Sequence, residues 1–278
     1  MSRTARRDDV LTYLGLLLVL LFFGTPLVWI VSLSLRDQAE ILATSLNPIP
    51  SDPMLDNYSA ILQSAQFPRF LVNSLALSLG GAIGAMLVSI PAAYAFSRLD
   101  FRGRKGLLIG VLALQMISPL VVAFPLYRYF ASLGLLDSMA AVGVVYVAIL
   151  MPLATWMLKG FFDGIPKDLD DAARLDGASR LTVLRQIILP IARSGLTAVF
   201  VLTAILAWGE FVIPYILLTS PSELPISVGI LNFQGTYATN ATGILAAGGV
   251  IAILPAVLVF VVLQRFIVGA FVGGAIKG

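Results

Sequence analysis

DDAARLDGASRLTVLRQIILP, residues 170–190, is a charged stretch in a chain that is otherwise mostly apolar. Its aspartates and arginines alternate with alanine and leucine at helical spacing, which gives each helical turn a polar and an apolar side. Such a pattern is typical of a helix that lies outside a bilayer and meets a soluble partner. The plainer alternative is an interfacial helix that only connects two membrane spans.

The stretch predicts two short helices joined at a glycine, which we call the elbow (residues 168–190). The first helix begins after a proline, with Asp168 as its N-cap and Asp171 in the position of a capping-box acid. It ends near Leu175, and Asp176-Gly177 supplies the turn. We expect Ser179 to cap the second helix, whose predicted apolar face consists of Leu181, Leu184, Ile187 and Ile188. Pro190 is expected to interrupt this helix.

The composition indicates an integral membrane protein. Of 278 residues, 59% are hydrophobic and 12% are charged, whereas soluble domains average roughly 25% charged residues. The sequence has no cysteine and no histidine, which excludes disulfides, thiol nucleophiles and metal sites built on those residues. The net charge of +3 is small, and we expect neither a metal nor nucleic acid as a ligand.

Hydropathy predicts six transmembrane helices near residues 11–35, 70–96, 107–127, 139–158, 196–218 and 244–264. The first is longer than the roughly 7 to 15 residues of a signal-peptide core, so we expect it to be retained. If the N-terminus is cytoplasmic, only Arg36, Arg69 and Arg128 of the 18 basic residues lie outside. The positive-inside rule therefore predicts that both termini are cytoplasmic.

This topology divides the chain into five regions. They are a cytoplasmic N-terminus (1–10), a first span (11–35), an external loop (36–69), a transmembrane core domain (70–265) and a cytoplasmic tail (266–278). The elbow lies in the cytoplasmic loop 163–195, between the fourth and fifth spans. Its partner is therefore expected in the cytoplasm.

The spacing within the elbow resembles the coupling motif of ATP-binding-cassette importer permeases, E-A-A-x3-G-x9-I-x-L-P. The matching residues are Asp171, Ala172, Ala173, Gly177, Ile187, Leu189 and Pro190, with Asp171 in place of glutamate. Other stretches, among them FLVNSLALS (70–78), LGLLDSMAAV (133–142) and AWGEFVIP (207–214), resemble carbohydrate permeases of the maltose-transporter type. That family usually has asparagine where this chain has Gly209. The resemblance covers most of the chain from residue 53 onward.

The resemblance implies a type I importer (MetI-like) permease fold, as the six-span subunit of a heterodimeric pair. In that family the elbow, here including Asp176, seats in a cleft of a separate ATPase dimer. The sequence has no G-x-x-x-x-G-K-[ST] phosphate loop, so we expect ATP and Mg²⁺ on the ATPase and no cofactor on this chain. The other implied partners are a second homologous permease, an extracytoplasmic sugar-binding protein and the lipid bilayer, in the cell membrane of a prokaryote.

The resemblance also implies contacts at two further places. The C-terminal Lys277 and Gly278 are expected to reach the ATPase subunits. The external loop 219–242 is expected to enter the sugar-binding protein, with an unremarkable connector as the alternative. The candidate contact residues in this loop are Asn232, Phe233, Gln234 and Gly235.

Three polar or aromatic residues are candidates for the translocation path. A charge near mid-membrane is unfavourable by roughly 2.5 to 3.5 kcal/mol, which singles out Glu210 in the fifth span. It either lines a sugar path or is a structural acid bonded to a neighbouring helix. Asn73 and Trp208 have the hydrogen-bonding and stacking groups that suit a neutral sugar, although helix packing also explains them. Gln115, Tyr146 and Trp156 share these properties.

The predicted function is the permease subunit of an ATP-driven importer for a di- or oligosaccharide. An importer permease for a non-sugar solute is one alternative. Half of a secondary transporter is another, but that class is expected to carry several buried acids or cation sites. A membrane-embedded hydrolase would need catalytic groups that the sequence lacks.

Overall fold

The structure is a computed structural model that describes residues 3–43, 47–233 and 241–275. Within these residues every regular element is a helix, and the predicted all-α class is confirmed. The chain divides into two compact units. The first unit is residues 1–67 with 230–254, and the second is residues 68–229 with 255–278.

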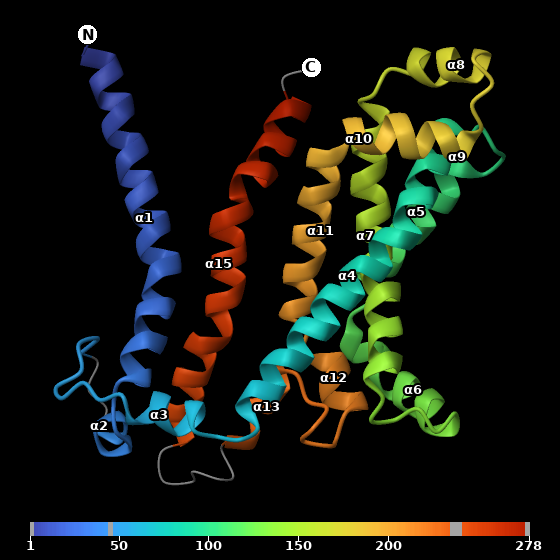
Figure 1. The fold of residues 1–278 in the computed structure, drawn as a ribbon. Coiled ribbons are helices and arrows are strands. Elements are labelled where there is room, and N and C mark those ends of the chain that lie inside the picture. The colour runs from blue at the N-terminus through green and yellow to red at the C-terminus, as the bar shows by residue number, and fades with distance from the viewer. Residues whose placement is uncertain (1–2, 44–46, 234–240, 276–278) are drawn as a thin grey trace. The chain divides into compact units, whose positions relative to one another are not determined.

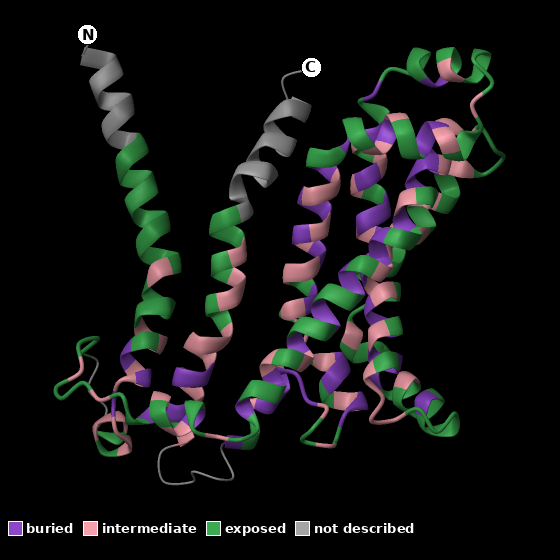
Figure 2. Ribbon diagram, viewed as in Figure 1, coloured by how far each residue is buried: buried purple, intermediate pink, exposed green. Residues whose placement is uncertain are grey.

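The first unit contains α1 (Arg3–Ser34), α2 (Gln38–Leu42), α3 (Asp56–Leu62) and the first part of α15 (Ala241–Ala275). The apolar part of α1, Thr12–Ser34, is long enough to cross a bilayer, and its most apolar window is 0% buried. Figure 2 colours most residues of this apolar part of α1 as exposed. At the end of α1, Asn57 Nδ2 donates to the carbonyl oxygens of Ser34 (3.0 Å) and Arg36 (2.9 Å). These bonds fix α3 against the chain that leaves α1.

The second unit contains most of the remaining helices (Figure 1). They are α4 (Phe67–Arg98), α5 (Arg104–Ala113), η1 (Leu114–Met116), α6 (Pro119–Ser132), α7 (Met139–Asp163), α8 (Asp168–Leu175), α9 (Arg180–Val183), η2 (Leu184–Ile188), α10 (Leu189–Ile191), α11 (Arg193–Trp208), α12 (Val212–Leu217) and α13 (Ile226–Gly229). The elbow helices α8 and α9 lie at one end of this unit, and α6, α12 and α13 lie at the other (Figure 1).

Two of the six predicted spans are not continuous helices. Four helices are long and apolar enough to span a bilayer, and two bent helix pairs bring the number to six if each pair is one span. The predicted third span, 107–127, bends by 90° before Pro119, because a proline forces the preceding residue out of the helical region. Ser118 is extended there, and its side chain accepts the Leu120 amide as the cap of α6.

The predicted fifth span, 196–218, breaks into α11 and α12. Helix α11 ends at Trp208, and Gly209 and Glu210 connect it to α12, which begins at Val212. Pro214 has no amide hydrogen to donate, and in the first turn of α12 none is needed. This break places Glu210 in a connection between helices and not within a helix.

The core of the second unit lies next to the elbow. Its buried residues come from α4, α7, the elbow, α11 and the short connections on either side of the elbow, and are Met86, Ala93, Tyr94, Ala154, Leu158, Phe162, Ile165, Val183, Leu184, Ile188, Ala192 and Val199. Close contact between helices depends on several glycines, and two examples lie against α7. A Cβ on Gly81 would lie 2.9 Å from the Tyr146 Cβ, and one on Gly195 would lie 2.5 Å from the Phe161 ring. These glycines let α4 and α11 pack closely against α7.

Candidate functional site

The elbow turns at Gly177, as predicted. Gly177 has φ +86°, a left-handed conformation that L-amino acids with side chains rarely adopt. Its amide donates to the Arg174 carbonyl (3.1 Å), and the Ala178 amide donates to the Ala173 carbonyl (3.0 Å). This pair of bonds is a Schellman motif, which closes α8 and redirects the chain into α9. The bend is therefore built from backbone hydrogen bonds that require a left-handed residue at position 177.

The N-terminal caps of the two elbow helices differ. Ser179 caps α9 as predicted, because its Oγ accepts the Thr182 amide at 3.2 Å. The prediction that Asp168 caps α8 is wrong. Lys167 occupies the N-cap, no side chain caps it, and its carbonyl accepts the Asp170 and Asp171 amides. Asp168 instead lies in the first turn, where the helix dipole favours acids without a directed cap bond.

Pro190 does not interrupt the second elbow helix, contrary to the prediction. The helix widens into the π-helical segment η2, where the Leu189 amide donates to the Leu184 carbonyl, and then continues through Pro190 to Ile191. Because a proline has no amide hydrogen, a wider turn just before it accommodates the missing bond. The sharp change comes afterwards, with an 81° bend between 180–191 and 193–208.

The motif residues differ in their exposure to solvent. Asp171, Ala172, Asp176, Gly177 and Pro190 are exposed, whereas Ala173, Ile187 and Leu189 are partly buried. Three large apolar side chains on the elbow also face outward: Leu175 is 89% exposed, Leu181 is 54% exposed and Leu169 is 41% exposed. The predicted apolar face is therefore wrong at Leu181, and Val183 is buried in its place with Leu184 and Ile188. The outward face presents both an acid and apolar surface.

A buried ion pair joins the elbow to α4, and the sequence reasoning missed it. Arg98 Nε lies 2.8 Å from Asp170 Oδ2, and the two side chains are 5% and 9% exposed. Tyr94, one turn earlier on α4, donates from its hydroxyl to Asp170 Oδ1 at 3.3 Å. The available signals were an arginine at the end of an apolar span and three acids in the first turn of α8. Neither signal identifies which residue pairs with which, because the two residues are 72 positions apart.

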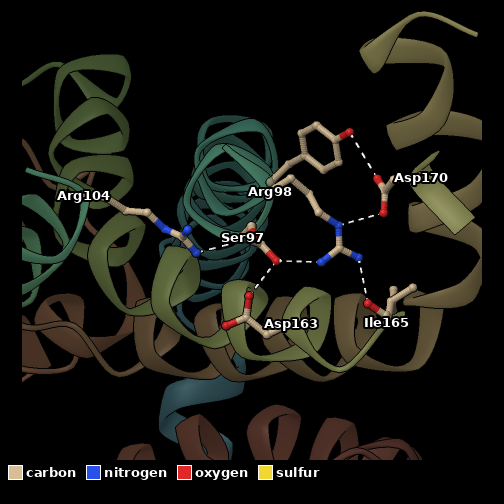
Figure 3. Close-up of polar contacts among 7 residues, drawn as sticks. Ser97, Arg98, Arg104, Asp163, Ile165 and Asp170 are labelled. Atoms are coloured by element: carbon tan, nitrogen blue, oxygen red, sulfur yellow. Dashed lines mark hydrogen bonds and ion pairs between the residues drawn. The ribbon is translucent and has the colours of Figure 1, made fainter. Parts of the chain in front are cut away.

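Arg98 also holds the chain between α7 and α8 (Figure 3). Its second terminal nitrogen donates to the Ile165 carbonyl at 3.0 Å, and its first donates to Ser97 Oγ at 3.1 Å. Ser97 in turn donates to Asp163 Oδ1, at the end of α7, at 2.6 Å. One guanidinium therefore connects α4 to α8 and to the α7–α8 linker, and through Ser97 to the end of α7.

Glu210, between α11 and α12, lines a small and mostly apolar pocket. The pocket has a volume of about 160 Å³, and Gln115 and Tyr146 line it together with Glu210 and apolar residues of α7 and α11. Glu210 Oε1 accepts the Ile213 amide at 3.1 Å, which satisfies a donor in the first turn of α12. The carboxylate is thus bound to a neighbouring helix and lines a cavity at the same time.

The other two predicted path residues lie elsewhere. Asn73 Nδ2 donates to the carbonyl oxygens of Ser222 (2.8 Å) and Leu224 (3.0 Å), so it anchors the segment after α12. Trp208 lines a separate, apolar pocket of about 240 Å³ with residues of α4, α11 and the second part of α15. Asn73, Trp208 and Glu210 therefore do not form one site. Trp156 is 51% exposed and lines neither pocket.

A second acid fixes the loops that follow α6 and α12. Asp137, between α6 and α7, has φ 58° and accepts the amides of Thr219 and Ser220, the latter at 2.8 Å. Its Oδ2 accepts the Thr219 hydroxyl at 2.6 Å. Hydrogen bonds from the Thr219 side chain and from these two amides lower the pKa of Asp137 from its ordinary value to about 2. The carboxylate therefore stays ionised while it holds the loop.

Of the predicted contact residues in the external loop and the C-terminal tail, the structure describes two. Asn232 is exposed, whereas Phe233 is buried at 3% exposed. Gln234, Gly235, Lys277 and Gly278 lie outside the described residues.

Comparisons with known proteins agree with the predicted resemblance. Residues 85–271 match the family model described as "Binding-protein-dependent transport system inner membrane component". The chain is 32% identical over 271 residues to the trehalose/maltose transport system permease protein MalG of Thermococcus litoralis, covering 97% of each chain. It is also 32% identical over 271 residues to the galactooligosaccharides transport system permease protein GanQ of Bacillus subtilis, covering 96% of this chain and 95% of the relative.

The fold is also found in a solved transporter. The structure aligns with a chain of a bacterial ABC transporter involved in the import of the acidic polysaccharide alginate, with a TM-score of 0.76. The alignment covers 95% of this chain and 98% of the other at 23% sequence identity. At that identity the likeness concerns the fold alone.

Proposed function

Because this chain belongs to the family of binding-protein-dependent transport system inner membrane components, we propose that it is the membrane-spanning subunit of an ATP-driven importer for a di- or oligosaccharide. The proposed substrate class follows the names of relatives that align over nearly their whole length. An external binding protein delivers the sugar, and the chain forms the translocation path with a second, homologous permease.

The observation that carries the proposal is the outward face of the elbow. Asp171 and Ala172 of the motif are exposed there, beside the apolar side chain of Leu175. An exposed leucine next to an acid on a short helix suits a cleft with apolar walls and basic or backbone donors at its rim. In this proposal an ATPase subunit provides the cleft, with ATP and Mg²⁺ bound to it. Asp176, the C-cap of α8, directly follows Leu175 and is also exposed.

The energy source must be a separate polypeptide, because the sequence contains no phosphate-binding loop of the G-x-x-x-x-G-K-[ST] type. Movement of the ATPase would then reach the membrane helices through the elbow. The basic residues favour an orientation with the elbow and both termini in the cytoplasm, in the cell membrane of a prokaryote. Lys277 and Gly278 would approach the same ATPase subunits.

The pocket around Glu210 is the proposed contribution of this chain to the sugar path. Gln115 and Tyr146 bring an amide and a hydroxyl to it, and apolar residues form the remaining wall. A neutral sugar is recognised by such groups without a buried counter-charge. At about 160 Å³ the pocket is too small to enclose a disaccharide, so the second permease would supply the rest of the site.

Co-purification tests the proposal. The affinity-tagged chain is isolated from its own cells in mild detergent, and its companions are identified by mass spectrometry. We expect an ATPase and a second permease, and we expect ATP-dependent uptake of a labelled disaccharide once the complex and a sugar-loaded binding protein are combined in vesicles. If the tagged chain is recovered without both companions and transports sugar on an ion gradient, it is a secondary transporter and the proposal is wrong.

A further inference from the structure

Besides its covalent connection to the end of α7 and its packing against the core, the elbow has two further physical links to the membrane helices, and the coupling motif accounts for only one of them. The first is covalent: α8 continues through Gly177 into α9 and then into α11. The second is the buried contact between Asp170 and Arg98, the last residue of α4. Helix α4 has 32 residues and is apolar enough to span the bilayer. The second link therefore connects the elbow to a different spanning helix.

We propose that the Arg98–Asp170 pair is a positioning joint that makes α4 move together with α8, so that the elbow drives α4 as well as α11. This rests on the proposed function, in which an ATPase docks on the elbow. Asp170 itself does not face the ATPase, because it is 7% exposed. Its neighbour Asp171 is exposed, since consecutive residues on a helix point about 100° apart.

The geometry of the guanidinium suits a joint that resists sliding and rotation. Its three nitrogens bond to three different groups, namely the Asp170 carboxylate, the Ser97 hydroxyl and the Ile165 carbonyl. Both oxygens of Asp170 are engaged, one by Arg98 and one by Tyr94. Directed bonds in several directions fix one relative placement, whereas apolar contacts such as those of Ala173 and Ala178 with the core tolerate displacement.

The same end of the unit contains a second ion pair that lacks these features. Arg104 and Asp100 form an i,i+4 pair at 3.0 Å, and the Asp100 side chain is 92% exposed. An exposed pair of this kind holds little in place. Asp100→Asn is therefore a matched control: it removes one acid from the same region and leaves every hydrogen bond of Arg98 and Asp170 in place.

The deciding experiment separates coupling from folding. Removing one partner of a buried pair leaves an unpaired charge, so single neutral variants are expected to fold poorly. The double variant Arg98→Met/Asp170→Leu removes both charges and keeps the volume, which favours folding. We expect it to assemble, to retain the ATPase and to show basal hydrolysis within about twofold of the parent. We expect sugar imported per ATP hydrolysed to fall about tenfold, within the range typical of coupling between sites.

Two other variants are compared with the double variant for sugar imported per ATP hydrolysed. Arg98→Lys keeps the charge but places a single ammonium where three nitrogens are needed, so its import per ATP should fall between those of the parent and the double variant. Asp100→Asn should match the parent. If the double variant imports as much sugar per ATP as the parent, the pair is only a folding contact and the inference is overturned. If the parent complex retains no ATPase, the proposed function fails instead.

A measurement on the unaltered joint decides the question even if the double variant does not fold. The chain has no cysteine, so spin labels can be placed at Leu87→Cys on α4 and Lys167→Cys at the start of α8, both exposed positions. In the assembled complex we expect one unchanged distance distribution without nucleotide, with ATP and with sugar-loaded binding protein. A distribution that shifts between these states shows that α8 moves relative to α4 and overturns the inference.

Discussion

Asp170 and Asp171 are adjacent in sequence, but they belong to opposite faces of the elbow. On the inner face, Asp170 is buried and bonds to Arg98 and Tyr94. On the outer face, Asp171 is exposed beside Leu175. The carboxylate of the inner face has its bonding partners within the chain. The outer face leaves an acid and an apolar side chain available to another molecule. In the proposed function the outer face is the docking surface and the inner face is its support.

The largest effect is expected where the two faces are joined. Gly177→Val places a β-branched side chain at φ +86°, which is strongly disfavoured and would open the turn between α8 and α9. We expect transport to be abolished while the chain still inserts in the membrane. Gly160→Val, at a helical glycine of α7 with open space around it, is the control and should transport normally. Normal uptake by Gly177→Val would remove the elbow from the mechanism.

The two aspartates should differ next in their effect on stability. Asp170→Asn leaves the buried Arg98 without its counter-charge, so we expect the free energy of unfolding to fall by about 3 kcal/mol. Asp171→Asn changes an exposed side chain, and we expect a change within about 0.5 kcal/mol. Detergent unfolding of the purified chain measures both. Equal losses would show that the two faces are not distinct.

For binding of the ATPase we expect the reverse order, with Asp171 more important than Asp170. Asp171→Ala removes an exposed carboxylate from the docking face, which we expect to weaken ATPase binding by roughly 1 kcal/mol, about fivefold, and to reduce sugar-stimulated hydrolysis. Asp171→Glu should retain or improve coupling, because it restores the residue usual in the motif with a longer reach. ATPase retained on the purified complex is the measurement. If Asp171→Ala retains the ATPase as firmly as the parent, docking depends on the apolar surface instead.

Glu210 extends the comparison to the connection between α11 and α12, because its carboxylate both bonds to α12 and lines a pocket. Glu210→Gln keeps an acceptor for the Ile213 amide, so only a modest effect on stability is expected. If the pocket belongs to the sugar path, apparent sugar affinity should change while ATPase retention does not. Loss of detergent stability with unchanged affinity would assign Glu210 a structural role alone.

Asp137 gives the smallest expected effect, and it depends on pH. Its pKa in the folded protein is about 2, below the ordinary value of about 3.9, so the folded state favours the ionised form. The stabilisation is fully present above about pH 4 and is lost as the pH falls through about 2. The protection of the Thr219 and Ser220 amides, measured as exchange relative to the intrinsic rate at each pH, should therefore stay high down to pH 4 and fall below it. In Asp137→Asn, exchange should be faster at neutral pH, and equal exchange in the two proteins would contradict the assignment.

Much of the fold follows from local sequence. Long apolar runs require helices, because a bilayer leaves no other way to satisfy the backbone. The turn at Gly177 and the cap at Ser179 also depend only on neighbouring residues, and the structure shows both. Local reasoning was wrong at Asp168 and Pro190, where a competing backbone arrangement was available within the same few residues: a carbonyl at Lys167 and a wider turn over η2.

What the sequence by itself determined is therefore the helical class, the number of apolar segments and the elbow with its glycine bend. Only the tertiary structure decided which side of each helix is buried, that Arg98 pairs with Asp170, and that Asn73 and Trp208 do not join Glu210. The physical reason is that helical periodicity fixes the spacing of side chains along one segment but not which distant segment they meet. Partners 72 positions apart along the chain are chosen by packing, and packing becomes visible only when the helices are assembled.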